Sequence, residues 1–148
     1  QGREDLSLLI TAGYMHDIGW RDVFKKEKIT FDELRELEPQ ANKNSEPYIK
    51  ELLKELNYNT TQIETILRLV SSADKYKAEK DDEEIIVDSD QLSKLDINHL
   101  KEKYQESEWL KMYKFWSTEM SKRVSTEKAK KLYPGLIVSL KKSIDSEL

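Results

Sequence analysis

The sequence contains no cysteine, only four glycines and three prolines, and no long hydrophobic segment. Without cysteine, neither disulfide bonds nor thiolate metal ligands can form. The few glycines and prolines allow few tight turns, which argues against a β-sandwich or barrel and favours helices. No apolar run approaches the roughly 20 residues that span a bilayer, and no signal peptide is recognisable. We therefore expect a cytoplasmic protein without a membrane partner.

Charged residues of both signs are abundant and well mixed along the chain. The 29 acidic and 25 basic residues give a net charge of −4. Lys and Arg form no basic stripe of the kind that binds nucleic acid, so we expect no nucleic-acid partner. A chain of 148 residues is long enough for one buried core, and we predict that residues 1–148 form a single domain.

Hydrophobic periodicity predicts an all-α fold of about six to eight helices. Ser45 and either Thr60 or Thr61 are expected N-caps, and Pro134 is expected to kink or split the last helix. The helices are expected over residues 4–16, 45–57, 60–72, 98–106, 108–123 and 126–146.

Three regions outside these helices are expected to be mostly irregular. Residues 20–44 are polar, with one short helix whose start at Thr30 fits a capping-box pattern. Residues 71–84 read as a polar loop that ends in an acidic run. The β-branched run at residues 85–87, Ile-Ile-Val, predicts an extended segment that enters a helix near Asp88.

A His-Asp pair follows the first, strongly apolar helix. His16 and Asp17 lie in residues 15–19, which read Met-His-Asp-Ile-Gly. Polar side chains are costly to bury at the end of such a helix unless they have partners. An imidazole and a carboxylate together suit a divalent transition-metal ion. The alternative interpretation is that the pair only caps the helix end.

Two more carboxylates, Asp88 and Asp90, follow the Ile-Ile-Val run with one residue between them. Because an apolar approach can direct them inward, they are the best candidates for further metal ligands. The alternative is that Asp90 caps the start of a following helix without any metal. The residues alone leave both interpretations open.

Residues 8–19 and 85–92 resemble the two later signatures of the HD superfamily, an all-α family of metal-dependent phosphohydrolases. The second segment contains Asp-Ser-Asp-Gln-Leu, close to the family pattern Asp-Ala-Asp-x-Leu. The tail from Trp116 also resembles the C-terminal part of one bacterial subgroup. The resemblance implies a single HD-type helical bundle. The chain departs from the family pattern in that no histidine precedes His16, so either an N-terminal helix is lacking or the metal site is incomplete.

The resemblance implies that His16, Asp17 and Asp90 hold one divalent ion, which could be Mn, Fe, Co, Ni, Zn or Mg. It also implies that Asp88 and Asp17 act close to the nucleophilic water. The residues expected to contact phosphate are Arg21, Lys75 and Lys94. The middle segments at residues 42–46 and 70–74 contain no histidine, which favours a mononuclear over a dinuclear centre.

The expected function is metal-dependent hydrolysis of a nucleotide or another phosphate ester, with a phosphorylated small molecule as partner. One alternative is a degenerate HD domain that binds a nucleotide or a protein without catalysis. A second is an all-α interaction module. The sequence leaves the oligomeric state open, including a homo-oligomer. His99 is expected to be structural, and Trp20 either packs against the helix end or lines a nucleotide pocket.

Overall fold

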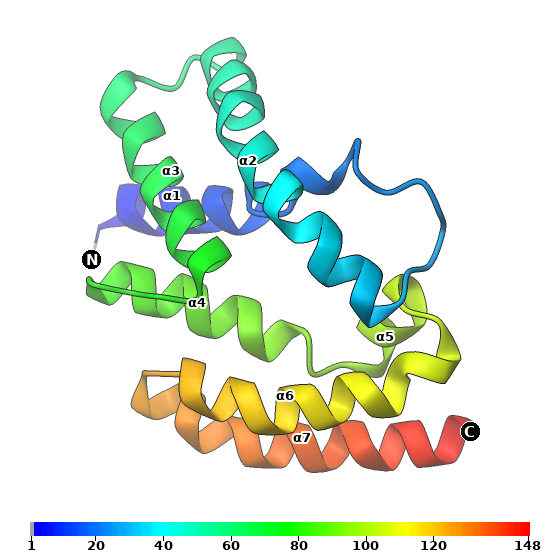
Figure 1. Ribbon diagram of the computed structural model, residues 1–148. Coiled ribbons are helices and arrows are strands. Elements are labelled where there is room, and N and C mark those ends of the chain that lie inside the picture. Colours follow the sequence, from blue (N-terminus) through cyan, green and yellow to red (C-terminus); the bar gives the residue numbers. More distant parts are fainter. Residues whose placement is uncertain (1) are drawn as a thin grey trace.

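A computed structural model describes residues 2–148, and it confirms the prediction of an all-α fold (Figure 1). Over this range, none of the helices is both long and apolar enough to cross a membrane. The described elements are α1 (Arg3–Met15), η1 (Ile18–Trp20), α2 (Phe31–Glu55), α3 (Thr60–Lys75), α4 (Asp81–Ser93), α5 (Ile97–Lys103), η2 (Glu106–Glu108), α6 (Trp109–Arg123) and α7 (Glu127–Glu147), where η1 and η2 are short 3-10 helices.

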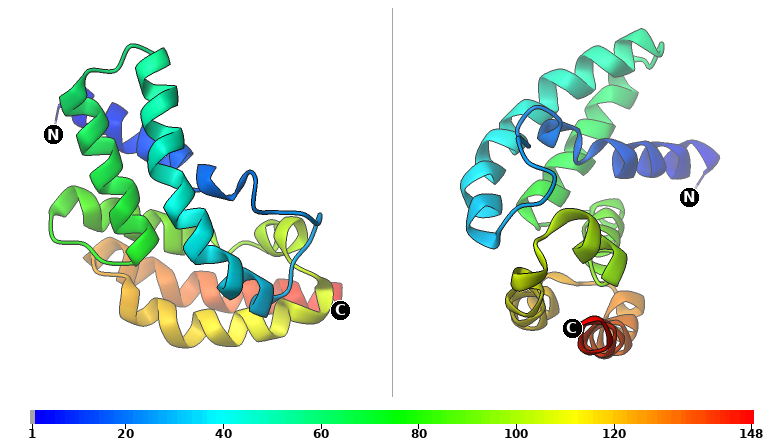
Figure 2. Two further views of the ribbon diagram at one scale, coloured as in Figure 1. Left: turned by 45° about the horizontal axis from the view of Figure 1, so that its top comes forward. Right: turned by 90° about the vertical axis from the view of Figure 1, so that its right-hand side faces the viewer.

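Two antiparallel helix pairs, α2 with α3 and α6 with α7, lie on opposite sides of α4 (Figures 1 and 2). Helix α4 contacts α1 and α3 on one side, and it contacts α6 and α7 on the other. Helix α1 lies across α3. The short helix α5 joins the two sides near the end where the chain finishes (Figure 1).

The main hydrophobic residues form two separate buried clusters, one on each side of α4. The first cluster is built by α1, α2, α3 and α4, and the second by α5, α6, α7 and the start of α2. The first includes Ala12, Ile49, Leu53, Ile66 and Leu69, and the second includes Leu100, Met112, Trp116, Met120, Leu140 and Ile144. Polar side chains that lie between the two clusters are therefore shielded by protein on both sides.

Helix α2 is longer than the sequence pattern predicted. It starts at the expected capping box, in which the Thr30 hydroxyl accepts from the Glu33 backbone N–H at 3.2 Å. It then continues without a break through Pro39 and Pro47. The predicted helix start at Ser45 is wrong, because Ser45 is buried in mid-helix.

A close crossing fixes the turn after α1 against α2. A Cβ atom added to Gly19 would lie 1.9 Å from the Ala41 carbonyl oxygen. No side chain fits in that space, so glycine allows η1 to touch the backbone of α2. The crossing holds the residues immediately before Gly19 at the edge of the space between the two clusters.

Two further expectations are corrected, and a third is corrected in part. Asn59, not Thr60 or Thr61, caps α3, and its side chain accepts from Gln62 N–H at 2.9 Å. The expected extended segment at residues 85–87 is helical within α4. Pro134, which is exposed, does not split the last helix, because α7 continues through it.

Candidate functional site

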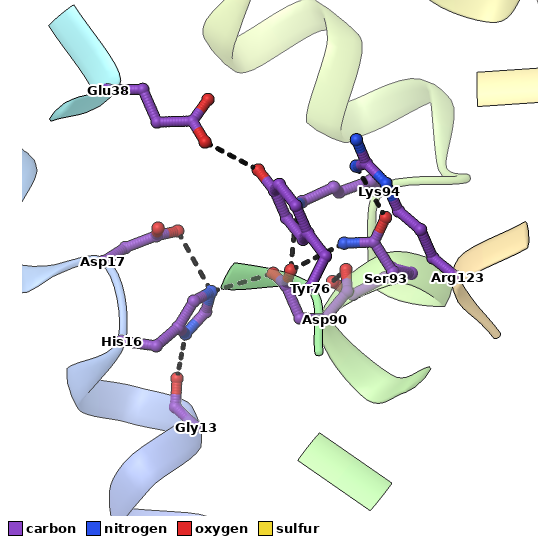
Figure 3. Close-up of polar contacts among 10 residues, drawn as sticks. Gly13, His16, Asp17, Glu38, Tyr76, Asp90, Ser93, Lys94 and Arg123 are labelled. Atoms are coloured by element: carbon purple, nitrogen blue, oxygen red, sulfur yellow. Dashed lines mark hydrogen bonds and ion pairs between the residues drawn. The ribbon is translucent and has the colours of Figure 1, made fainter. Parts of the chain in front are cut away.

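The predicted corner of His16, Asp17 and Asp90 is brought together by three elements (Figure 3). His16 caps the end of α1, Asp17 begins the turn into η1, and Asp90 lies in the last turn of α4. The Nε2 atom of His16 lies 2.9 Å from Asp90 Oδ1 and 3.4 Å from Asp17 Oδ2. The Nδ1 atom lies 2.7 Å from the Gly13 carbonyl oxygen, which fixes the ring.

Asp88 does not belong to this corner, and the expectation that it acts beside the metal is wrong. Because α4 is helical there, residues two apart point in nearly opposite directions. The Asp88 carboxylate accepts from the backbone N–H groups of Ser125 and Thr126, both at 2.9 Å. Asp88 therefore ties α4 to the start of α7. Asp90 is not the N-cap of a following helix either, because α4 already contains it.

The corner is strongly polarised. Burial alone lowers the pKa of His16, but the hydrogen bond to Asp90 and the charges of Asp17 and Asp90 raise it to about 9. Burial alone raises the pKa of Asp90, but Lys94 and His16 hold the pKa of its carboxyl below the usual range. At neutral pH, an imidazolium is therefore bonded to a buried carboxylate.

The donor atoms of the corner are chemically suited to a divalent ion. Two ligands bound to one ion at about 2.1 Å lie about 3.0 to 3.4 Å apart, close to the separations of His16 Nε2 from its two carboxylate partners. Over residues 2–148, however, no three His, Asp or Glu groups already surround a common point as a metal cage. Because metal ligands must be deprotonated, binding would displace the proton between His16 and Asp90.

Three acidic or phenolic residues of the site were not predicted from the sequence. Glu38 of α2, Asp74 of α3 and Tyr76 line the same cavity as the corner. The Tyr76 hydroxyl donates to Glu38 Oε1 at 3.1 Å. Tyr76 is the C-cap of α3 in the left-handed region, at φ 53°, a strained conformation for a residue with a side chain. Burial, reinforced by the nearby carboxylates, raises the pKa of Asp74 to about 7.

Two lysine and two arginine side chains line this cavity, whose volume is about 340 Å³. Lys94 donates to Asp90 Oδ2 at 2.8 Å. Arg123 lies over the Tyr76 ring at 3.9 Å and donates to the Gln91 side-chain oxygen at 3.2 Å. The remaining two are Arg35 and Lys103. The cavity thus places an acidic corner beside cationic groups from α2, α4, α5 and α6.

Comparison with protein-family models, curated proteins and solved structures finds no match to this chain. The resemblance to the HD superfamily therefore stays a prediction that rests on two segments of the chain. What the site can do follows from its own geometry.

Of the three predicted phosphate contacts, only Lys94 lines the cavity that contains the corner. Arg21 is exposed and lies over the Tyr48 ring, beside a second cavity. Lys75 is exposed and borders a smaller cavity between α2 and α3, of about 180 Å³. No local pattern marks Lys103 or Arg123, which approach the site from distant parts of the chain.

Trp20 is buried, whereas His99 is half-buried. Trp20 stacks on Phe24 with 4.9 Å between ring centroids, and it also borders the cavity. His99 lies about 6 Å from the rings of Tyr104 and Trp116. Within the described part of the chain, its buried Nε2 atom has no hydrogen-bond partner. Burial and the charge of Lys103 lower the pKa of His99 to about 4, so it is neutral at physiological pH.

Proposed function

We propose that this protein is a metal-dependent phosphohydrolase that acts on a nucleotide or another phosphate ester. One observation carries the proposal: His16, Asp17 and Asp90 converge within hydrogen-bonding reach in a cavity that cationic side chains also line. Hydrolysis of a phosphate ester needs both features, because positive charge must stabilise the phosphoryl oxygens while a water molecule is activated.

His16, Asp17 and Asp90 would hold the ion. A divalent cation bound there supplies Lewis acidity toward a phosphoryl oxygen and lowers the pKa of a water molecule. Lys94 fixes the orientation of Asp90 through its contact at 2.8 Å. Arg123 is held between Tyr76 and the Gln91 side chain, so its guanidinium is positioned to bind phosphoryl oxygens.

Asp74 is the candidate for proton transfer. It lines the same cavity as the corner, and burial holds its pKa near 7. A carboxyl group with a pKa close to the working pH can accept a proton from water and later release it. Asp74 is therefore the proposed residue close to the nucleophilic water, in place of Asp88.

A second candidate function is nucleotide or partner binding without catalysis. It is favoured by the direct bond between His16 and Asp90 and by the lack of a preformed metal cage in residues 2–148. In this case the corner is a closed ion pair, and only the cationic side of the cavity binds the phosphorylated ligand.

Phosphate release from a panel of nucleotides and simple phosphate esters, measured with Mn²⁺, Mg²⁺, Zn²⁺, Co²⁺ or Ni²⁺, tests the proposal. We expect turnover that needs one of these ions and that chelator abolishes. The Asp17→Asn variant is expected to lose at least about 100-fold in kcat/KM, because it removes a charged ligand. The Asp17 side chain is 58% exposed, so the substitution has little effect on folding.

Asp145→Asn is the matched control, because Asp145 is an exposed carboxylate that pairs with Lys141 on α7. This variant is expected to keep the wild-type activity. If no substrate is turned over with any ion, while nucleotides still bind, the catalytic proposal fails and the second candidate stands. Equal losses in Asp17→Asn and Asp145→Asn would also reject the assigned role of Asp17.

A further inference from the structure

A second cavity adjoins the one that contains the acidic corner. Its volume is about 510 Å³, within the range of small-molecule sites. Asp17, Trp20 and Lys103 line both cavities, so these three residues mark the boundary between them. Phe24 and His99 line only the second cavity. A ligand that extends past the corner toward this side must pass Lys103.

Lys103 differs from the other cations at the site in what surrounds its ammonium group. The Nζ atom lies 5.1 Å from the centre of the Trp20 ring and 5.8 Å from that of Phe24. Across the described residues, no carboxylate lies within 4.0 Å of it, the limit for an ion pair. Burial lowers the pKa of Lys103, and the carboxylates of Asp17, Asp90 and Glu38, which lie beyond ion-pair distance, offset this only in part.

Lys94 provides the comparison. Its ammonium is also half-buried in the cavity, but Asp90 accepts its hydrogen bond at 2.8 Å. A half-buried cation with a carboxylate partner contributes to the protein's own structure. One that lies over aromatic rings and has no ion-pair partner among the described residues can still bind an anion from outside.

We propose that Lys103 is a specificity-determining residue that binds a second phosphate group of the substrate, next to the one held at the acidic corner. The organic part of the substrate then lies in the second cavity, against the half-buried ring of Phe24. The ligand class is a nucleoside diphosphate or triphosphate in preference to a monophosphate. The inference rests on the proposed function, which places the first phosphate at the corner.

Equilibrium binding of two probes tests the inference on the full chain. The probes are AMP and the α,β-methylene analogue of ADP, whose bridge resists hydrolysis, each titrated calorimetrically with and without Mn²⁺. We expect the wild-type protein to bind the diphosphate analogue at least about tenfold more tightly than AMP. Lys103→Met keeps most of the side-chain volume without the charge, and it is expected to lose this preference.

Two other variants complete the test. Lys103→Arg retains a cation and should retain most of the preference for the diphosphate. Lys101→Met is the matched control on the same helix, because Lys101 pairs with Glu147 away from both cavities. It is expected to bind both probes as the wild type does. Circular dichroism confirms that each variant is folded, and Lys103→Gln replaces Lys103→Met if that variant does not fold.

The inference is overturned if AMP and the analogue bind the wild type equally, if neither binds, or if the preference survives in Lys103→Met. It is also overturned if Lys103→Met weakens both probes by the same factor, because Lys103 would then contact the first phosphate. Turnover is a separate measurement. A preference that depends on Lys103 in a protein without turnover supports this inference and rejects the proposed catalysis. Turnover in a protein whose preference does not depend on Lys103 supports the catalysis and rejects this inference.

Discussion

Among the buried carboxylates of helix α4, Asp88 and Asp90 lie on opposite faces, and their partners differ. Asp88 accepts from two backbone N–H groups at the start of α7. Asp90 accepts from the side chains of His16 and Lys94. Backbone amides are fixed dipoles that keep their protons, whereas an imidazolium can give up its proton and a lysine side chain can move. The burial of a carboxylate therefore does not identify a functional site, and the nature of its partners is more informative.

The largest expected difference between the two faces is in metal-dependent activity. Asp90→Asn should lower kcat/KM by at least about 1,000-fold, or about 4 kcal/mol of transition-state stabilisation, because it removes a charged ligand. Asp88→Asn is the matched variant on the same helix, and it should bind Mn²⁺ as the wild type does. Calorimetric titration with Mn²⁺ and initial rates measure the two effects. Equal losses in both variants would remove the distinction between the faces.

The opposite ranking is expected for stability when Asp88 is truncated. Asp88→Ala leaves the N–H groups of Ser125 and Thr126 without their acceptor, which costs about 2 to 4 kcal/mol of unfolding free energy. Urea unfolding followed by circular dichroism measures this change. A loss below about 1 kcal/mol would show that the contact between α4 and α7 does not depend on this carboxylate.

His99 extends the comparison, because no group in residues 2–148 forms a hydrogen bond with its buried Nε2 atom. Its pKa is about 4 in the folded protein, against 6.5 for an ordinary histidine. Between these values the unfolded chain binds a proton that the folded protein does not bind. The unfolding free energy should therefore fall as the pH is lowered, by about 2 kcal/mol for this group from pH 7 to pH 5.

Urea unfolding at the two pH values, for the wild type and for His99→Leu, measures this contribution. The variant has no imidazole to protonate, so it should lose about 2 kcal/mol less than the wild type over the same pH range. The carboxylates titrate in both proteins and cancel in the difference. An identical pH dependence of the two proteins would contradict the buried, neutral state of His99.

The smallest expected effect is the loss of unfolding free energy when the N-cap of α7, Thr126, is removed while Asp88 is kept. The Thr126 hydroxyl accepts from the Ala129 N–H at 3.2 Å, within the same helix. Thr126→Ala should cost about 1 kcal/mol of unfolding free energy, the usual value for a lost N-cap. Urea unfolding measures it, and Mn²⁺ affinity should not change. A cost as large as that of Asp88→Ala would mean that the two caps act as one unit.

The elements predicted best are those whose apolar residues recur along the whole helix. Helices α1, α3 and α6 were predicted within a few residues of their observed bounds. The first part of helix α4 was missed, because the Ile-Ile-Val run at residues 85–87 favours an extended segment when taken alone. The acidic run that had been assigned to a loop instead fills the first turn of α4, where negative charge is favourable. Packing against four helices then outweighs local propensity.

The site was predictable only where its residues form a local pattern. His16, Asp17 and Asp90 stand in recognisable segments, and the structure brings them together. Asp74 and Lys103 carry no such pattern. They come from different helices, and their role depends on how the two helix pairs pack around α4, which no spacing along the sequence records. Asp88 was misassigned because an extended backbone would direct it to the same side as Asp90. In a helix, residues two apart point in nearly opposite directions.

The position of the cavity between the two hydrophobic clusters has a practical consequence for identifying the ligand. The residues that line it come from both sides of α4, so a bound molecule contacts helices of both hydrophobic clusters. A ligand present at about 100 times its Kd adds about 2.7 kcal/mol to the unfolding free energy. That raises Tm by several degrees in a domain of this size. A thermal-shift screen of phosphorylated metabolites can therefore detect a ligand in this cavity before any reaction is known.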